Sequence, residues 1–263
     1  MLSGILNIAK KAAYNAAKVI QSESRKLDKI EISTKGYKDY VTNVDKKSEE
    51  IIIKTIQSAY PHHNILAEES GNAHSSDSNV TWIIDPIDGT TNFIHGHPNY
   101  SISIAIAHDG EITHGVILDP SRNDVYVAQL GRGSYLNDTR IRVSNRTNFS
   151  QSLIGCGHPG SDEVTQEKFY TLYKQFHLQT SGQRRLGSAA LDLAYVACGH
   201  VDGFWEFNLK PWDFAAGVLL VKEAGGIVSD FNKKNDFWEN GNILAANPKI
   251  YNHMFKLINQ HLK

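Results

Sequence analysis

Two aspartates three residues apart form the pattern with the clearest chemical meaning in this sequence. Asp85 and Asp88 follow the apolar run 82–84, which predicts a buried strand. Two carboxylates at the end of such a strand repel each other unless they are protonated or share a cation. Their oxygens are hard ligands of the kind that suits Mg²⁺. An Asx turn followed by a helix N-cap explains the same residues, so the pair alone leaves both interpretations open.

The residues around this pair favour the chemical interpretation. Gly89 allows a ligand to approach the backbone closely, and a helix that begins near Thr90 would offer free N–H groups to a phosphate. Glu68 and Glu69 also follow an apolar strand, and they would add negative charge if the two strand ends lie side by side. Metal ligands beside an anion-binding turn predict a site for a phosphate ester.

Two further acidic residues have simpler explanations. Asp213 stands at the start of an apolar helix, where an N-cap role is the more economical interpretation. Thr42 and Asp45 have the spacing of a capping box ahead of a helix. Neither motif alone indicates a catalytic role.

Five separated motifs resemble the inositol monophosphatase family, most closely its bacterial SuhB-type branch. They are KG at 35–36 with DYVTNVD at 39–45, AEESG at 67–71, DPIDGTTNF at 85–93, GSAALD at 187–192 and WDFAAG at 212–217. They occur in the family's order, and the resemblance extends over essentially the whole chain. The double-aspartate and Trp-Asp motifs are specific to the lithium-sensitive, Mg²⁺-dependent phosphatases.

The resemblance implies a role for each matching residue. Glu68, Asp85 and the backbone carbonyl of Ile87 would hold one Mg²⁺, and Asp85, Asp88 and Asp213 would hold a second. Asp45 and Thr90 would be the catalytic pair that orients and deprotonates the attacking water. The backbone of Gly89 and Thr90 would receive the phosphate. The remaining contacts, to the hydroxyls of a polyol, would come from Asp88, Gly187, Ser188, Ala189, Glu206 and Asp213.

The expected activity is the Mg²⁺-dependent hydrolysis of inositol 1-phosphate, or of a similar polyol or sugar phosphate, by a metal-activated water. The same chemistry on fructose 1,6-bisphosphate, a nucleotide 3′-phosphate or histidinol phosphate remains an alternative, because a fold does not decide among substrates. A protein-interaction role with the transcription machinery is a second alternative, and the resemblance also implies a homodimer. Arg184 and Arg185 could contact a phosphate, form an interface or be a solvated basic pair. Residues 155–159 receive no role.

The elements that must position these residues alternate irregularly along the chain. Helices are predicted over the first twenty residues and over 44–59, 163–176, 189–198, 214–224 and 249–261. Strands are predicted over 64–67, 81–84, 101–107, 113–119, 124–129, 151–155, 201–207, 227–230 and 243–245. The hairpin-like spacing of 101–129 indicates antiparallel pairing, and residues 34–39 and 71–79 are expected to be loops.

Mixed helices and antiparallel strands indicate an α+β fold with helices layered against two sheets. The resemblance specifies a layered αβαβα sandwich of the sugar-phosphatase type. Residues 1–263 are expected to form a single unit, with a metal and phosphate half at 1–145 and a substrate half at 146–263.

The composition limits the other functions that this chain could have. The 263 residues include 27 Lys and Arg against 28 Asp and Glu, for a formal net charge of −1. Such a balance predicts neither direct nucleic-acid binding nor attachment to a membrane. No apolar run reaches the length of a membrane span, and the 2 cysteines are expected to be reduced interior thiols. These features predict a cytoplasmic protein.

Overall fold

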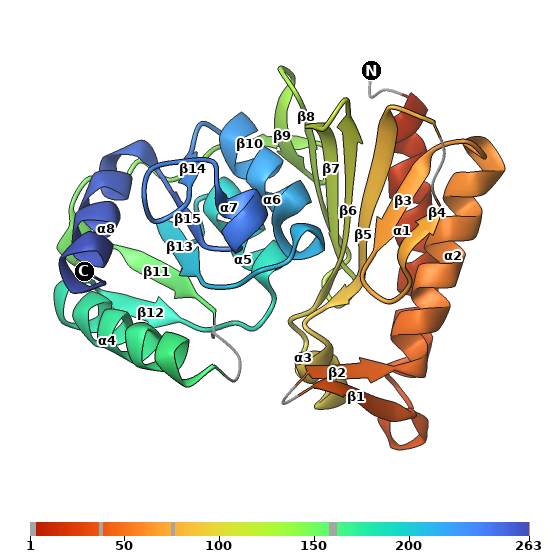
Figure 1. Ribbon diagram of the computed structural model, residues 1–263, viewed down its shortest axis with the longest axis horizontal. Helices are drawn as coiled ribbons and strands as arrows, with labels where there is room; N and C mark the ends of the chain where they lie inside the picture. The colour runs from red at the N-terminus through yellow and green to blue at the C-terminus, as the bar shows by residue number, and fades with distance from the viewer. Residues whose placement is uncertain (1–3, 37–38, 75–76, 158–161, 263) are drawn as a thin grey trace.

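An eight-stranded sheet is formed by strands between residues 64 and 141 (Figure 1). The computed structural model describes residues 4–36, 39–74, 77–157 and 162–262. In order across the sheet, the strands are β10 (Thr139–Ile141), β9 (Gly133–Leu136), β8 (Asp124–Gln129), β7 (Glu111–Asp119), β6 (Ser101–His108), β5 (Val80–Asp88), β3 (Asn64–Ala67) and β4 (Gly71–His74). All neighbours are antiparallel except β3 and β5. The predicted antiparallel pairing of residues 101–129 is therefore confirmed.

Because β3 and β5 run parallel, the acidic segments that follow them lie side by side at the carboxyl ends of these two strands. Ala67, the last residue of β3, pairs with Ile84 of β5. The next residues are Glu68 and Asp85, and the Glu68 N–H donates to the Ile84 carbonyl over 3.1 Å. The sequence-based expectation that acidic residues at two strand ends lie side by side is thus met.

Strand β5 is longer than the predicted strand over 81–84. It continues through Pro86 to Asp88, and its register against β6 shifts between Asp85 and Asp88. Proline is tolerated in a strand at an irregularity of this kind, because no ladder N–H is needed there. The two aspartates therefore lie on an irregular strand end rather than in a turn that follows the strand.

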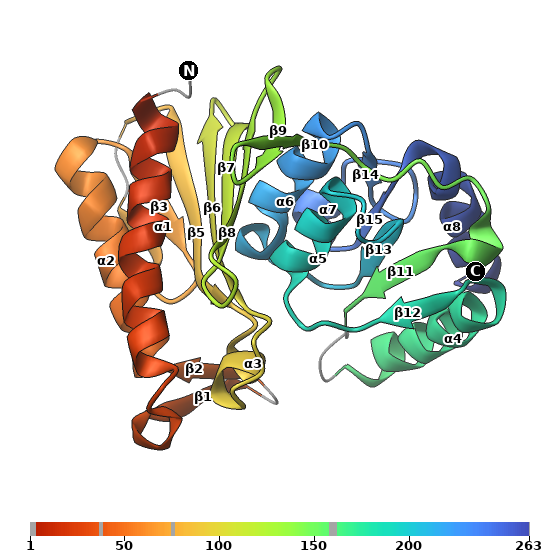
Figure 2. The same cartoon turned by 180° about the vertical axis from the view of Figure 1, so that it is seen from behind.

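Two pairs of helices cover the two faces of the large sheet (Figures 1 and 2). On one face lie α1 (Gly4–Glu23) and α2 (Asn43–Ala59), which share a buried core with the sheet. The other face is covered by α5 (Ala189–Ala197) and α6 (Pro211–Glu223). These two helices pack closely, since a Cβ on Gly217 of α6 would lie 2.6 Å from the side chain of Leu193 in α5.

A five-stranded sheet lies on the far side of α5 and α6. Its order is β12 (Gly182–Arg184), β11 (Leu153–Cys156), β13 (Gly203–Glu206), β15 (Ile243–Ala246) and β14 (Ile227–Ser229). On its outer face, α4 (Glu163–Gln179) and α8 (Pro248–His261) pack around buried aromatic side chains, Trp205 among them. The layers thus run helix, sheet, helix, sheet, helix, and the predicted α+β fold with an αβαβα sandwich is confirmed.

Several short elements were not predicted. Residues 34–39 were expected to be a loop, but β1 (Ile32–Gly36) and β2 (Asp39–Thr42) pair as a two-stranded sheet; residues 37 and 38 lie outside the described part. The loop expected over 71–79 contains β4. Both segments are polar, so they lack the alternating pattern that predicts a strand. The other elements that were not predicted are the strands β9, β10 and β12, the helix α7 (Phe237–Asn240) and the 3₁₀ helices Leu27–Lys29 and Phe149–Gln151. The helix start expected near Thr90 is confirmed as α3 (Thr90–Ile94).

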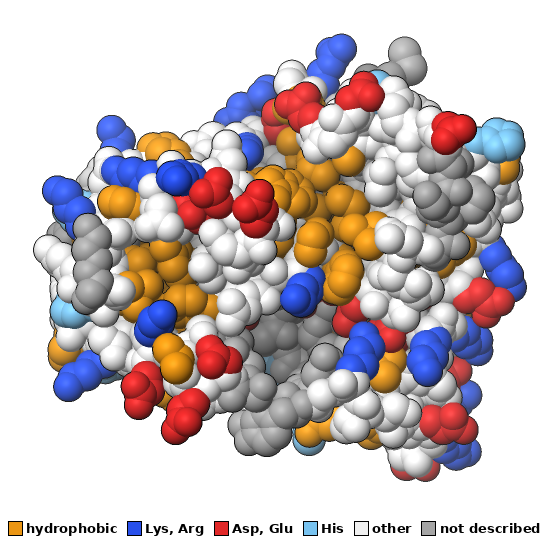
Figure 3. Space-filling model, in the orientation of Figure 1, with side chains coloured by type: hydrophobic (Ala, Val, Ile, Leu, Met, Phe, Trp, Pro, Cys, Tyr) orange, Lys and Arg blue, Asp and Glu red, His pale blue; other side chains and the backbone are white. Residues whose placement is uncertain are grey.

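The apolar character of the helices and the charge of the surface bear on whether the protein binds a membrane or a nucleic acid. Within the described residues, none of the helices has the length and apolar character needed to cross a bilayer. The face in Figure 3 carries Lys and Arg side chains interspersed with Asp and Glu side chains. The charge on this face is therefore mixed in sign, as the balanced composition suggests.

Candidate active site

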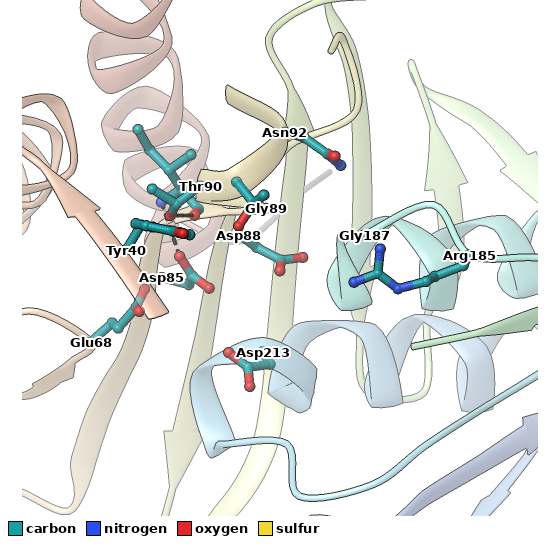
Figure 4. A pocket seen from close by; sticks show the side chains of 12 residues that line it. Tyr40, Glu68, Asp85, Asp88, Gly89, Thr90, Asn92, Arg185, Gly187 and Asp213 are labelled. Carbon is teal, nitrogen blue, oxygen red and sulfur yellow. Dashed lines mark hydrogen bonds between the residues drawn. The ribbon is translucent and has the colours of Figure 1, made fainter. Parts of the chain in front are cut away.

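Four acidic side chains from three parts of the fold line one cavity of about 220 Å³. Glu68 follows β3, Asp85 and Asp88 end β5, and Asp213 lies in the first turn of α6. Figure 4 shows their carboxylates facing a common space, with Arg185 on the opposite side. The same cavity is lined by Ile87, Gly89, Thr90 and Gly187. The sequence-predicted residues are thus brought together, although their roles remain predictions.

Burial and neighbouring acidic groups raise the pKa of two carboxyl groups in this cavity. Burial raises the pKa of Asp85 well above its usual value, and the charges of its acidic neighbours raise it further. Burial likewise raises the pKa of Asp213, with a contribution from the charge of Asp88. A bound cation would reverse these effects by favouring the ionised carboxylates.

The oxygen ligands of this cavity suit a hard cation such as Mg²⁺, but their side chains do not converge on a single point in this structure. Within the described residues, no three His, Cys, Asp or Glu side chains form a group that could hold a metal ion as they stand. Lys35 lies beside the acidic side chains, with its Nζ 3.0 Å from Glu68 Oε1 and 2.6 Å from Glu69 Oε1. The cavity offers carboxylates and a backbone carbonyl, the oxygen ligands that Mg²⁺ prefers.

Thr90 and Asp45 are in hydrogen-bond contact beside this cavity. The Thr90 hydroxyl lies 3.0 Å from Asp45 Oδ1 and 3.0 Å from the Ile87 carbonyl. Asp45 Oδ2 accepts from the Thr42 N–H over 2.8 Å, and the Thr42 side chain accepts from the N–H of Asp45. The capping box and the predicted catalytic pair are therefore both present, because each oxygen of one carboxylate serves a different contact. Burial raises the pKa of Asp45.

The backbone at Gly89 has no room for a side chain. Its φ is +96°, and a Cβ would lie 2.9 Å from the Gly187 carbonyl oxygen and 3.1 Å from that of Asn99. Only glycine fits such a position. The helix that follows, α3, has only five residues. The expected helix start at Thr90 is present, but any phosphate bound here would depend on individual N–H groups more than on the dipole of so short a helix.

A second cavity of about 190 Å³ adjoins the first and contains the remaining predicted substrate contacts. Asp88, Arg185, Gly187 and Asp213 line both cavities. The predicted contacts that line only the second are Ser188, Ala189 and Glu206. One substrate could therefore place its phosphate in the first cavity and its alcohol part in the second.

Asp88 connects the first cavity to helix α5. Its Oδ2 accepts from the Ser188 hydroxyl over 2.5 Å and from the Ala190 N–H over 2.7 Å. Asp213 is held in a comparable way, since its Oδ2 accepts from the Lys210 N–H over 2.7 Å. The N-cap interpretation of Asp213 is wrong in detail, because Lys210 is the N-cap residue and Asp213 is the third residue of α6, whose side chain accepts from the N-cap N–H while lining the cavity.

Sequence reasoning missed three residues that shape this region. Glu49 of α2 is buried and accepts from the Glu69 N–H over 2.8 Å and from the Ser70 hydroxyl over 2.6 Å, so it fixes the segment that carries Glu68. Its spacing of four residues after Asp45 places it on the same helix face, and this was an available signal. Gly157 and Asp192 line the second cavity. Asp192 ends the GSAALD motif quoted above but was given no role, and no comparable signal marked Gly157.

The chain is similar to known proteins over nearly its whole length. The model of the inositol monophosphatase family matches residues 1–263. The chain is 47% identical over 261 residues to the putative Nus factor SuhB of Neisseria meningitidis serogroup A, covering 99% of this chain and 100% of that protein. It is 41% identical to the inositol-1-monophosphatase of Mesorhizobium japonicum, covering 99% of this chain and 98% of that one. The crystal structure of the extragenic suppressor protein SuhB from Bartonella henselae has a TM-score of 0.95 at 39% identity, covering 98% of this chain and 99% of that one. This chain therefore belongs to the inositol monophosphatase family.

Proposed function

We propose that this protein is a Mg²⁺-dependent, lithium-sensitive phosphatase that releases phosphate from inositol 1-phosphate or from a similar polyol or sugar phosphate. The observation that supports this most strongly is the meeting of four acidic side chains with the Thr90–Asp45 pair at one cavity that opens into a second. The name of the Mesorhizobium relative, an inositol-1-monophosphatase, supports the choice of substrate.

In this proposal, Glu68, Asp85, Asp88, Asp213 and the carbonyl of Ile87 hold the Mg²⁺. When bound, Mg²⁺ lowers the pKa of water and offsets the charge of the phosphoryl oxygens. The Thr90 hydroxyl orients the attacking water while donating to Asp45. Burial makes Asp45 more basic than an exposed aspartate, which suits it to accept a proton through Thr90.

The backbone at Gly89 and Thr90 receives the phosphate, and the alcohol product occupies the second cavity. There, Glu206 and the α5 residues Ser188 and Ala189 contact its hydroxyl groups. Residues 1–145 contribute most of the metal and phosphate site, and residues 146–263 most of the substrate site. Assembly as a homodimer and a location in the cytoplasm are parts of the same proposal.

A Mg²⁺ titration of phosphate release from a panel of monoesters tests the proposal. The panel contains inositol 1-phosphate, fructose 1,6-bisphosphate, adenosine 3′,5′-bisphosphate and histidinol phosphate, each with and without Li⁺. We expect release to require Mg²⁺, to fall with Li⁺ and to have the highest kcat/KM on inositol 1-phosphate. Negligible turnover of inositol 1-phosphate would contradict the substrate, and release without any Mg²⁺ would contradict the mechanism.

A protein-interaction role with the transcription machinery is a second proposal, which the names of relatives support. The Neisseria relative is called a putative Nus factor, and the Pseudomonas aeruginosa and Escherichia coli relatives are called Nus factors. Asp88→Asn separates the two functions. It removes one charge from the metal site but keeps an oxygen that can accept from Ala190. We expect it to abolish turnover while leaving binding to a purified transcription complex unchanged.

A further inference from the structure

The second cavity contains a buried acid that the proposed reaction does not use. Asp192 lies in the first turn of α5 and is 1% exposed. It lines the second cavity and not the first. Its Oδ1 atom has no hydrogen-bond partner within the described part of the chain. A buried polar atom without a partner is uncommon in folded proteins and calls for a physical explanation.

Another buried aspartate of the same molecule, Asp202, shows how unusual the unpartnered oxygen of Asp192 is. Asp202 is similarly buried, at 3% exposed. Its carboxylate accepts from the Ser144 hydroxyl, the Arg146 guanidinium and the Leu153 N–H, at 2.5, 3.0 and 2.8 Å. Leaving a buried carboxyl oxygen unpaired costs stability, because it loses its water and gains no donor. Unlike the carboxylate of Asp202, Oδ1 of Asp192 therefore has no donor among the described residues that explains its burial.

Asp192 Oδ1 is packed against the backbone of β11, while the residue as a whole lines the second cavity. Gly155 of β11 faces this oxygen, and a Cβ at residue 155 would lie 3.2 Å from it. The other charged groups that line the cavity are Asp88, Glu206, Asp213 and Arg185. Three of these four are acidic, so they disfavour a second phosphate next to Asp192. An uncharged group that carries a hydrogen-bond donor is compatible with these surroundings.

We propose that Asp192 is a specificity-determining residue that forms a hydrogen bond with a hydroxyl group of the polyol part of the substrate. This inference rests on the proposed phosphatase function and deepens it. Asp192 would complete its own hydrogen bonding only when a polyol is bound. A substrate whose alcohol part lacks hydroxyl groups would gain nothing from it.

Two variants and two substrates test the role of Asp192. Asp192→Ala removes the carboxyl, and Asp192→Asn keeps its shape and a polar group. The substrates are inositol 1-phosphate and phenyl phosphate, whose leaving group has no further hydroxyl. For Asp192→Ala we expect KM for inositol 1-phosphate to rise about tenfold, the effect of losing one good hydrogen bond, with KM for phenyl phosphate unchanged. For Asp192→Asn, KM for inositol 1-phosphate should lie between the values of the wild type and of Asp192→Ala.

Thermal unfolding distinguishes substrate binding from a purely structural role. Without substrate, Asp192→Asn should unfold at the same temperature as the wild type or at a higher one, because it replaces an unpaired acid. Asp202→Asn is the matched control: it breaks a satisfied network outside the cavities, so it should lower the unfolding temperature and affect both substrates equally.

Two results would overturn the role of Asp192 alone: an unchanged KM for inositol 1-phosphate in Asp192→Ala, or equal losses on both substrates together with a lower unfolding temperature in Asp192→Asn. Both presuppose a wild-type protein that hydrolyses the two substrates. A wild-type protein that hydrolyses neither would contradict the proposed function, and this inference with it.

Discussion

The Thr90 hydroxyl at the start of α3 lies 3.0 Å from Asp45 Oδ1 in α2, while the other oxygen of Asp45 caps α2 itself. The cap fixes the orientation of the carboxylate, so its free side faces Thr90. The hydroxyl also lies 3.0 Å from the Ile87 carbonyl and has a single proton, which it can give fully to only one of the two acceptors. A donation to Asp45 leaves the oxygen of Thr90 available to a water.

Replacing Thr90 by Val should slow the proposed reaction without unfolding the protein. The valine keeps the shape of the side chain but cannot relay a proton, so we expect kcat to fall by about 10²- to 10⁴-fold. KM and the unfolding temperature should change little, because the Thr42–Asp45 cap remains. Steady-state kinetics on inositol 1-phosphate measures this, with Thr90→Ser as the variant that keeps the hydroxyl. A Thr90→Val enzyme with more than a tenth of the wild-type kcat would exclude the relay.

The sequence was sufficient to predict the acidic cluster but not all of its surroundings. Apolar runs before Glu68 and Asp85 predicted two strand ends, and the register of β3 and β5 places these residues at one edge. The capping box of Asp45 was also visible, because it is local. Its contact with Thr90 spans 45 residues and depends on the packing of α2, so only the resemblance suggested it.

The missed features share a physical cause, the absence of a local pattern. Strands β1 and β4 are polar edge segments that are held by backbone pairing, which leaves no alternation in their side chains. Asp192 was part of a quoted motif, yet nothing in its neighbours indicates that its Oδ1 atom is buried without a partner. Burial of that kind is determined by α5, β11 and β13 together, and becomes visible only in the folded chain.

Both thiols should react slowly in the native protein. The cysteines are free, and burial raises the pKa of Cys156 to about 12 and that of Cys198 to about 11. Because the reactive form is the thiolate, a raised pKa lowers its fraction at pH 8. We expect labelling by a thiol-specific disulfide reagent to be at least tenfold slower in buffer than in denaturant, where both cysteines should react. Rapid labelling of one thiol in native protein would show that its surroundings are open.

Glu49→Gln should weaken Mg²⁺ binding through the position of Glu68. Glu49 holds the Glu69 N–H and the Ser70 hydroxyl, one with each carboxylate oxygen. A glutamine offers a single acceptor oxygen and turns a donor towards one of these groups. We expect the Mg²⁺ affinity measured by calorimetry to fall several-fold, and the Mg²⁺ concentration for half-maximal activity to rise equally, with a smaller change in kcat at saturating Mg²⁺.

The neighbouring residue provides the control for Glu49. Glu50 is exposed and pairs with Lys54 on the same helix, so Glu50→Gln makes the same chemical change without touching the site. It should leave the Mg²⁺ affinity unchanged. Ser70→Ala removes one of the two contacts and should have a smaller effect than Glu49→Gln. Equal Mg²⁺ affinities in the Glu49 and Glu50 variants would mean that Glu49 does not position the metal site.

Gly157→Ala should impair recognition of the polyol by displacing Glu206. A Cβ on residue 157 would lie 1.6 Å from the carboxyl carbon of Glu206, so the acidic side chain must leave its place in the second cavity. We expect KM for inositol 1-phosphate to rise while the kinetics with phenyl phosphate stay the same. The double variant Gly157→Ala/Glu206→Ala separates this cause from a general distortion of the loop. Once Glu206 is truncated the clash is gone, so the double variant should match Glu206→Ala alone. Additive losses would instead indicate that the alanine disturbs the backbone after β11.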